Sequence, residues 1–130
     1  MKIKQFEELD SWKKARELTN MIYDLTEQKG FSRDLRLRDQ IRDSSGSVMH
    51  NIAEGFDAGS DAEFIRFLKI SRRSASEVQS QLYLALDRKY ITEAQLQTSY
   101  DKATEVKRLI NGLISYLRRN TKSSNSRIVR

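Results

Sequence analysis

The stretch Asn51-Ile52-Ala53-Glu54-Gly55 ends a segment of strong helical character and leads into the loop Phe56-Asp57-Ala58-Gly59-Ser60. Gly55 suits the left-handed C′ position that terminates many helices. After the loop, Ser60-Asp61-Ala62-Glu63 has the pattern of a capping box, in which the serine hydroxyl and the glutamate carboxylate satisfy unpaired amide donors. We therefore predict that one helix ends near Glu54 and that another begins at Ser60.

Apolar residues recur at three- and four-residue steps in four segments, at about 9–28, 33–54, 60–89 and 92–119. Ser32 is the expected N-cap of the second helix, and Thr92-Glu93-Ala94-Gln95 repeats the capping box before the fourth. Short connections between long amphipathic helices favour an all-α, antiparallel up-down four-helix bundle. We expect this domain to occupy residues 1–120, with residues 121–130 forming a basic, disordered tail.

Composition excludes several classes of protein. The 130 residues include no proline, so no proline interrupts long helices. They also include no cysteine, which excludes thiolate chemistry. No apolar run approaches the ~20 residues that span a bilayer, and no signal-peptide core follows Met1, so we expect a cytoplasmic protein without membrane contact. Of the 24 basic residues, five lie in residues 118–130, which hold no acid. The remainder of the chain is therefore nearly neutral.

Small residues lie near the middle of the second and third helices, at Ser44-Ser45-Gly46-Ser47 and at Ser71, Ser74 and Ala75. They predict a close approach of the two helix backbones. The alternative interpretation is that the serines line the bottom of a ligand pocket. Polar residues flank both apolar stripes, among them Asn51, Glu54, Ser74 and Glu77. These flanks could form a buried hydrogen-bond network, border a subunit interface or face solvent; buried glutamates would need partners such as Arg42 or Arg72.

Catalytic signals are weak. The single histidine, His50, shares a helix face with Glu54, but two ligands do not make a metal site. The chain has no nucleophile-elbow motif and no glycine-rich phosphate loop. We expect no enzymatic activity, no cofactor and no metal.

Apolar residues beyond those that a bundle core needs lie on the third and fourth helices. Such a surplus predicts a further contact surface, and self-association is its simplest use. The candidate interface residues are Ile65, Ile70, Tyr83, Leu84, Leu109 and Tyr116.

Basic residues gather on the third helix and at the end of the chain. Arg66, Lys69 and Arg73 share the outer face of the third helix, with Arg72 to one side. On the second helix, by contrast, aspartates interleave with the arginines and dilute their field. The candidate nucleic-acid-binding residues are Arg66, Lys69, Arg72, Arg73, Arg118, Arg119 and Lys122. No helix-turn-helix, RNA-recognition or zinc-finger signature is visible, so any binding should favour the phosphate backbone over sequence.

Several stretches of this sequence resemble those of a known family: Asn51 to Gly55, Phe64 to Leu68, Ser74, Glu77 and Tyr90-Ile91. It consists of small four-helix-bundle proteins encoded in intervening sequences of bacterial large-subunit ribosomal RNA genes. The resemblance extends to about Asn120 and implies a homopentameric ring. The accessory proteins of diversity-generating retroelements look like relatives, which implies RNA or DNA and a reverse transcriptase as partners.

Two departures from the family pattern stand out. Arg73 replaces the usual glycine, which could alter helix packing or add charge, and Ser47-Val48-Met49 lacks a common proline, which predicts a straighter second helix.

Two functions follow from the whole sequence. The leading hypothesis is a nucleic-acid-associated accessory protein, and the alternative is a protein-interaction scaffold whose charge is incidental.

Overall fold

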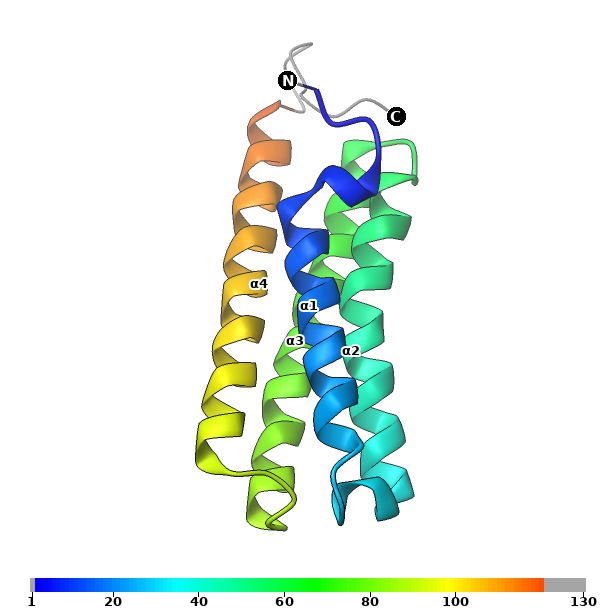
Figure 1. Cartoon of the computed structure of the whole chain (residues 1–130). Helices are drawn as coiled ribbons and strands as arrows, with labels where there is room; N and C mark the ends of the chain where they lie inside the picture. Colours follow the sequence, from blue (N-terminus) through cyan, green and yellow to red (C-terminus); the bar gives the residue numbers. More distant parts are fainter. Residues whose placement is uncertain (1, 121–130) are drawn as a thin grey trace.

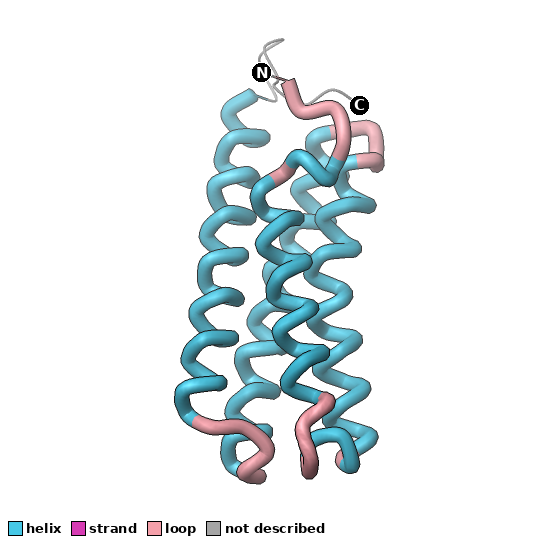
Figure 2. Tube along the Cα trace, viewed as in Figure 1, coloured by secondary structure: helices cyan, strands magenta, loops and turns pink. Residues whose placement is uncertain are grey.

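The computed structural model describes residues 2–120, which form four long helices packed side by side (Figures 1 and 2). The helices are α1 (Asp10–Thr26), α2 (Leu35–Phe56), α3 (Asp61–Asp87) and α4 (Glu93–Asn120), with short 3-10 turns at Phe6–Glu8 and Phe31–Arg33. Consecutive helices run in opposite directions (Figure 1), and α4 returns to pack on α1. The prediction of an all-α four-helix bundle is confirmed, whereas the predicted tail at residues 121–130 lies outside the described residues.

Side chains at the helix starts explain where each helix begins. Thr92 and Gln95 form the complete predicted capping box. The Thr92 amide donates to Gln95 Oε1 at 3.0 Å, and the Gln95 amide donates to Thr92 Oγ1 at 3.1 Å. At α3 the Ser60 hydroxyl accepts from the Glu63 amide as predicted. The predicted Ser32 cap of α2 is wrong. Ser32 belongs to a 3-10 turn, and Asp34 caps α2 by accepting from the Leu37 amide at 3.1 Å.

The predicted role of Gly55 is also wrong. Gly55 lies inside α2, which continues to Phe56, and the positive φ of +89° belongs to Gly59 in the following loop. A Cβ at Gly55 would lie 2.7 Å from Phe67 Cβ and 2.9 Å from Phe64 Cδ1. A glycine is needed here because α3 comes too close to α2 for any side chain.

The small residues in the middle of α2 and α3 serve the close approach that the sequence predicts. Ser71 Oγ donates to the Val48 carbonyl at 2.6 Å, and the Ser47 and Ser74 hydroxyls lie 2.9 Å apart. Ser45 is fully buried, and its carbonyl accepts from the Thr19 hydroxyl of α1. Ser45, Ser47, Ser71 and Ser74 therefore take part in contacts between helices, as close packing requires.

The apolar core divides into two clusters along the length of the bundle. One cluster includes Phe56, Phe64 and Ile110, near the end where α2 passes into α3. The other includes Ile22 and Leu82, near the opposite end. In α2 the serines from Ser44 to Ser47 lie between Ile41 of the second cluster and Val48 of the first. α3 packs against both α2 and α4. Its solvent-facing side carries the exposed residues Lys69, Arg73 and Ser76.

Replacing Gly55 with alanine should lower the free energy of unfolding by about 1–3 kcal/mol, because the added methyl overlaps Phe67 and Phe64. Urea denaturation measures this change. Gly112→Ala in α4 is the matched control, because a Cβ at Gly112 meets nothing within 4 Å. This control should raise stability by about 0.5–1 kcal/mol through helix propensity. Equal effects of the two substitutions would contradict the close approach of α3 at Gly55.

Candidate nucleic-acid interface

A basic hollow of about 500 Å3 lies on the outer surface between α3 and α4. Its lining residues are Lys69, Arg72, Arg73 and Ser76 from α3 and Lys107 from α4. The α3 residues recur at three- and four-residue steps, so successive turns of one helix present them on the same side. We call this feature the α3/α4 hollow.

Two of its cations cross the gap between the helices in opposite directions. Arg72 reaches from α3 to α4, where its Nη1 donates to Asn111 Oδ1 at 2.7 Å. Lys107 reaches from α4 to α3, where its ammonium donates to Ser76 Oγ at 3.1 Å and to Gln79 Oε1 at 2.9 Å. Each long side chain is thereby held at its charged end, which reduces the rotamer freedom that an exposed lysine or arginine usually keeps.

The amide of Gln79 is itself fixed in orientation. Gln79 is buried, with 6% of its surface exposed, and its Nε2 donates to the Tyr100 carbonyl at 3.2 Å and to Thr104 Oγ1 at 2.9 Å. Because the nitrogen must face these two acceptors, the Oε1 atom faces Lys107. Gln79 therefore sets the position of the Lys107 ammonium.

The groups that hold Arg72 and Lys107 are all uncharged. Within residues 2–120 the ion pairs form elsewhere, as at Lys14–Glu17, Arg38–Asp39 and Lys102–Glu105, and none includes a cation of the α3/α4 hollow. An amide or hydroxyl oxygen orients a cation without cancelling its charge. The hollow therefore keeps the positive potential of four side chains that lie close together.

Arg66, which the sequence places in the same basic stripe, differs from these four residues. Its guanidinium donates to both carboxylate oxygens of Glu63, at 3.2 and 3.1 Å, and lies 4.5 Å from the centre of the Phe67 ring. The hydrogen bonds from Arg66 hold the pKa of Glu63 below its usual value. The charge of Arg66 is thus largely compensated, and Lys107 contributes the fourth cation instead.

The remaining basic candidates lie away from the hollow. Arg118 and Arg119 occupy the last turn of α4, and Lys122 lies outside the described residues. Arg42, expected as a partner of a buried glutamate, instead donates to Thr26 Oγ1 at 2.8 Å and stacks on Tyr23. Arg72 likewise binds Asn111 and not a glutamate. The glutamates need no buried partner because Glu54 and Glu77 are both exposed.

The flank between α2 and α3 contains the predicted hydrogen-bond network in a shorter form. Asn51 Nδ2 donates to the carbonyl and to the hydroxyl of Ser47, and that hydroxyl contacts Ser74. These bonds connect the two helices beside the core and explain the polar flank without a ligand.

The six apolar interface candidates are divided between the core and the surface. Ile65 and Tyr116 pack, partly buried, against the core cluster that contains Phe64, and Ile70 and Leu109 are half-buried. Tyr83 and Leu84 are the exposed pair, at 51% and 49%. Tyr83 also makes an edge contact with the Tyr100 ring.

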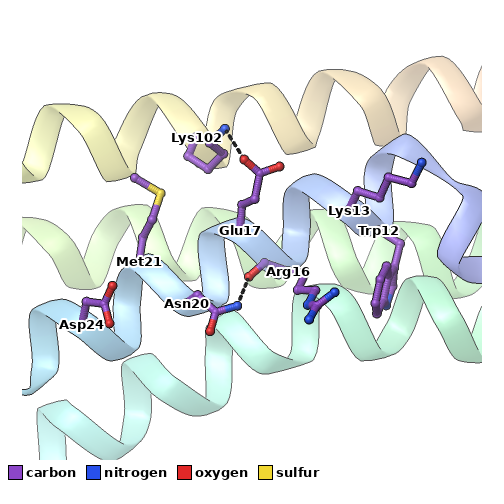
Figure 3. Close-up of a pocket in the computed structure, with 8 residues that line it drawn as sticks. All are labelled: Trp12, Lys13, Arg16, Glu17, Asn20, Met21, Asp24 and Lys102. Atoms are coloured by element: carbon purple, nitrogen blue, oxygen red, sulfur yellow. Dashed lines mark hydrogen bonds and ion pairs between the residues drawn. The ribbon is translucent and has the colours of Figure 1, made fainter.

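A larger groove of about 720 Å3 lies between α1 and α4 (Figure 3). Its lining mixes both charges: Glu17 binds Lys102 across the groove, and Arg16 lies 5.8 Å from the centre of the Trp12 ring. Glu105 raises the pKa of Lys102 through a hydrogen bond, so this cation has carboxylate partners. The α1/α4 groove therefore lacks the uniform positive charge of the α3/α4 hollow.

Within residues 2–120 no three histidine, aspartate or glutamate side chains gather closely enough to hold a metal ion. None of the described helices combines the length and the apolar character needed to cross a membrane.

The fold and the hollow define a four-helix-bundle protein with a basic seam between its last two helices. Residues 7–112 match the family described as 23S rRNA-intervening sequence protein, and the chain belongs to this family. The resemblance found in the sequence is thereby confirmed, while the relation to retroelement accessory proteins stays a prediction.

A solved structure supports the fold. It is a protein of unknown function from the S23 ribosomal protein family of Bacteroides thetaiotaomicron, with 28% sequence identity and a TM-score of 0.73. The match covers 81% of this chain and 95% of that one. A comparison with curated proteins gives no significant match.

Proposed function

We propose that this protein is a non-enzymatic, nucleic-acid-associated accessory protein that binds the phosphate backbone of RNA or DNA at the α3/α4 hollow. The observation that carries the proposal is the set of four cations, Lys69, Arg72, Arg73 and Lys107, none of which is paired with a carboxylate within residues 2–120. Phosphates are the natural ligands of such a cluster, because arginine and lysine together supply fixed donors and point charges.

Backbone contacts account for this geometry better than base readout. The hollow lies along a seam between two helices, and its polar groups are cations and one hydroxyl. Contacts of this kind supply affinity and register but no direct information about sequence. Because the description of the family refers to intervening sequences of 23S rRNA, RNA is the first nucleic acid to test.

Replacing Lys69, Arg73 and Lys107 together with glutamine should weaken binding to a structured RNA at least tenfold. Each lost phosphate contact removes roughly 0.7–0.9 from the slope of log affinity against log salt, so the slope should fall in magnitude by about 2 to 3. Fluorescence anisotropy over a range of salt concentrations measures both quantities.

The matched control replaces Lys29, Arg33 and Arg36 with glutamine. These three exposed residues lie near the end of the bundle where α1 passes into α2, whereas the hollow lies near the middle of α3 and α4, and the substitution removes the same charge. The control should keep most of the affinity. Equal losses in the two triple variants would indicate a diffuse charge effect. Undiminished binding by the first variant would contradict the proposed interface and favour the protein-interaction scaffold.

Self-association, with a homopentamer as the expected state, is part of the same proposal. Tyr83 and Leu84 are large, adjacent and half exposed on α3, as an interface between copies would require. A symmetric ring would also repeat the α3/α4 hollow and steepen the salt dependence of binding. A reverse transcriptase partner and a cytoplasmic location stay predictions.

Light scattering should give the mass of an oligomer for the wild-type protein and a smaller mass for the variant with Tyr83→Gln and Leu84→Gln. Leu35→Gln is the control, because Leu35 is 58% exposed at the start of α2 and lies outside the proposed interface. A monomeric wild-type mass at micromolar concentration would rule out the pentamer.

A further inference from the structure

We infer that the α3/α4 hollow is a discrete site for a phosphate monoester, and that on RNA its ligand is the terminal phosphate of a strand. The inference rests on the proposed function for the choice of RNA as the source of the phosphate. It goes further in specifying one doubly charged group in one position in place of a diffuse track of backbone diesters.

The donors of the hollow are oriented before any ligand arrives. The Lys107 ammonium has three N–H donors, of which Ser76 and Gln79 accept two, so one remains for a ligand. The Arg72 guanidinium has five, and Asn111 accepts one. Because both side chains are already held, a ligand does not have to order them on binding. Such preorganisation favours a single defined contact over loose surface attraction.

The charge of the hollow matches a dianion. Four cations line it, and the acceptors that hold Arg72 and Lys107 are neutral. A phosphate monoester carries about −1.5 to −2 at pH 7, whereas a backbone diester carries a single negative charge. The Coulomb energy scales with ligand charge at a given distance, so each cation attracts the monoester nearly twice as strongly.

The size of the hollow is consistent with the same ligand. Its volume of about 500 Å3 falls within the range of roughly 300–1,000 Å3 that is usual for small-molecule sites. It therefore has room for a phosphate group with its nucleoside. Ser76 lies at the exposed rim and contacts Lys107 through its hydroxyl. An aspartate at this position would pair with Lys107 and would repel a dianion.

The test compares two RNA oligonucleotides of one sequence, one with a 5′-phosphate and one with a 5′-hydroxyl, at a single salt concentration. We expect the phosphorylated strand to bind about tenfold more tightly, a difference of about 1.4 kcal/mol. Inorganic phosphate should compete away this advantage. Fluorescence anisotropy with the dye at the 3′ end measures both effects on the full-length protein.

Ser76→Asp should abolish the preference for the phosphorylated strand. Ala94→Asp is the control, because it adds the same charge at an exposed position roughly 20 Å from Lys107 along α4. That distance exceeds the screening length of about 8 Å at physiological salt. Circular dichroism spectra of both variants establish that the bundle is retained. A preference that survives Ser76→Asp would overturn the assignment of the site.

The outcomes separate this inference from the proposed function. Equal, salt-dependent binding of the two strands would overturn the monoester site and leave backbone binding intact. Binding of neither strand, without any effect of inorganic phosphate, would overturn both. If inorganic phosphate shifts the side-chain amide resonances of Gln79 and Asn111 but no RNA binds, the site stands and its ligand is a small phosphate monoester.

Discussion

The close approach of α2 and α3 is the constraint on which the other features of this bundle depend. Gly55 has no space for a Cβ, and the Ser71 hydroxyl reaches the Val48 carbonyl at 2.6 Å. Backbones this close leave little freedom to slide or rotate, because closely packed interiors resist small shifts. The outward face of α3 is therefore set by the contacts on its inward face. Lys69, Arg72 and Arg73 are presented beside α4 for that reason.

The second controlling feature is the chemistry of the groups that hold the cations. Had carboxylates held Arg72 and Lys107, the hollow would keep only the charges of Lys69 and Arg73, because each held cation would be compensated as Glu63 compensates Arg66 on the same helix. Asparagine, serine and glutamine fix the two cations and leave their charge in place. Burying the Gln79 amide is tolerable because its nitrogen has acceptors on α4 and its oxygen has Lys107.

Sequence reasoning predicted the four helices to within a few residues at most of their ends, together with the Thr92–Gln95 box and the close packing of the serines. These features depend on local spacing, which a sequence displays directly. It misassigned Gly55 because a glycine that allows a close approach looks the same as one that adopts a positive φ. Ser32 was misassigned as the cap because it belongs to a 3-10 turn that the helical spacing does not display, and α2 begins only after Asp34.

The candidate site was predictable in part. A helical projection places Lys69, Arg72 and Arg73 together, but it cannot show that Glu63 compensates Arg66. Lys107 was missed because it lies on another helix, and its place depends on how α3 and α4 are aligned. The contacts Arg72–Asn111 and Lys107–Ser76 define this alignment. Moving four residues forward on α3, from Arg72 to Ser76, corresponds to moving four residues back on α4, from Asn111 to Lys107, so both contacts fit one antiparallel register. The polar residues Lys107 and Asn111, four residues apart on α4 and opposite Ser76 and Arg72 of α3, were the signal that could have revealed it.

The most direct test of binding at the α3/α4 hollow is an NMR titration of labelled protein with a short RNA. The side-chain amides of Gln79 and Asn111 report on the hollow, and the single tryptophan, Trp12, reports on the α1/α4 groove through its indole N–H. Binding at the hollow predicts that the two amide signals shift and saturate while the Trp12 signal stays in place. A shift of Trp12 with unmoved amide signals would contradict it.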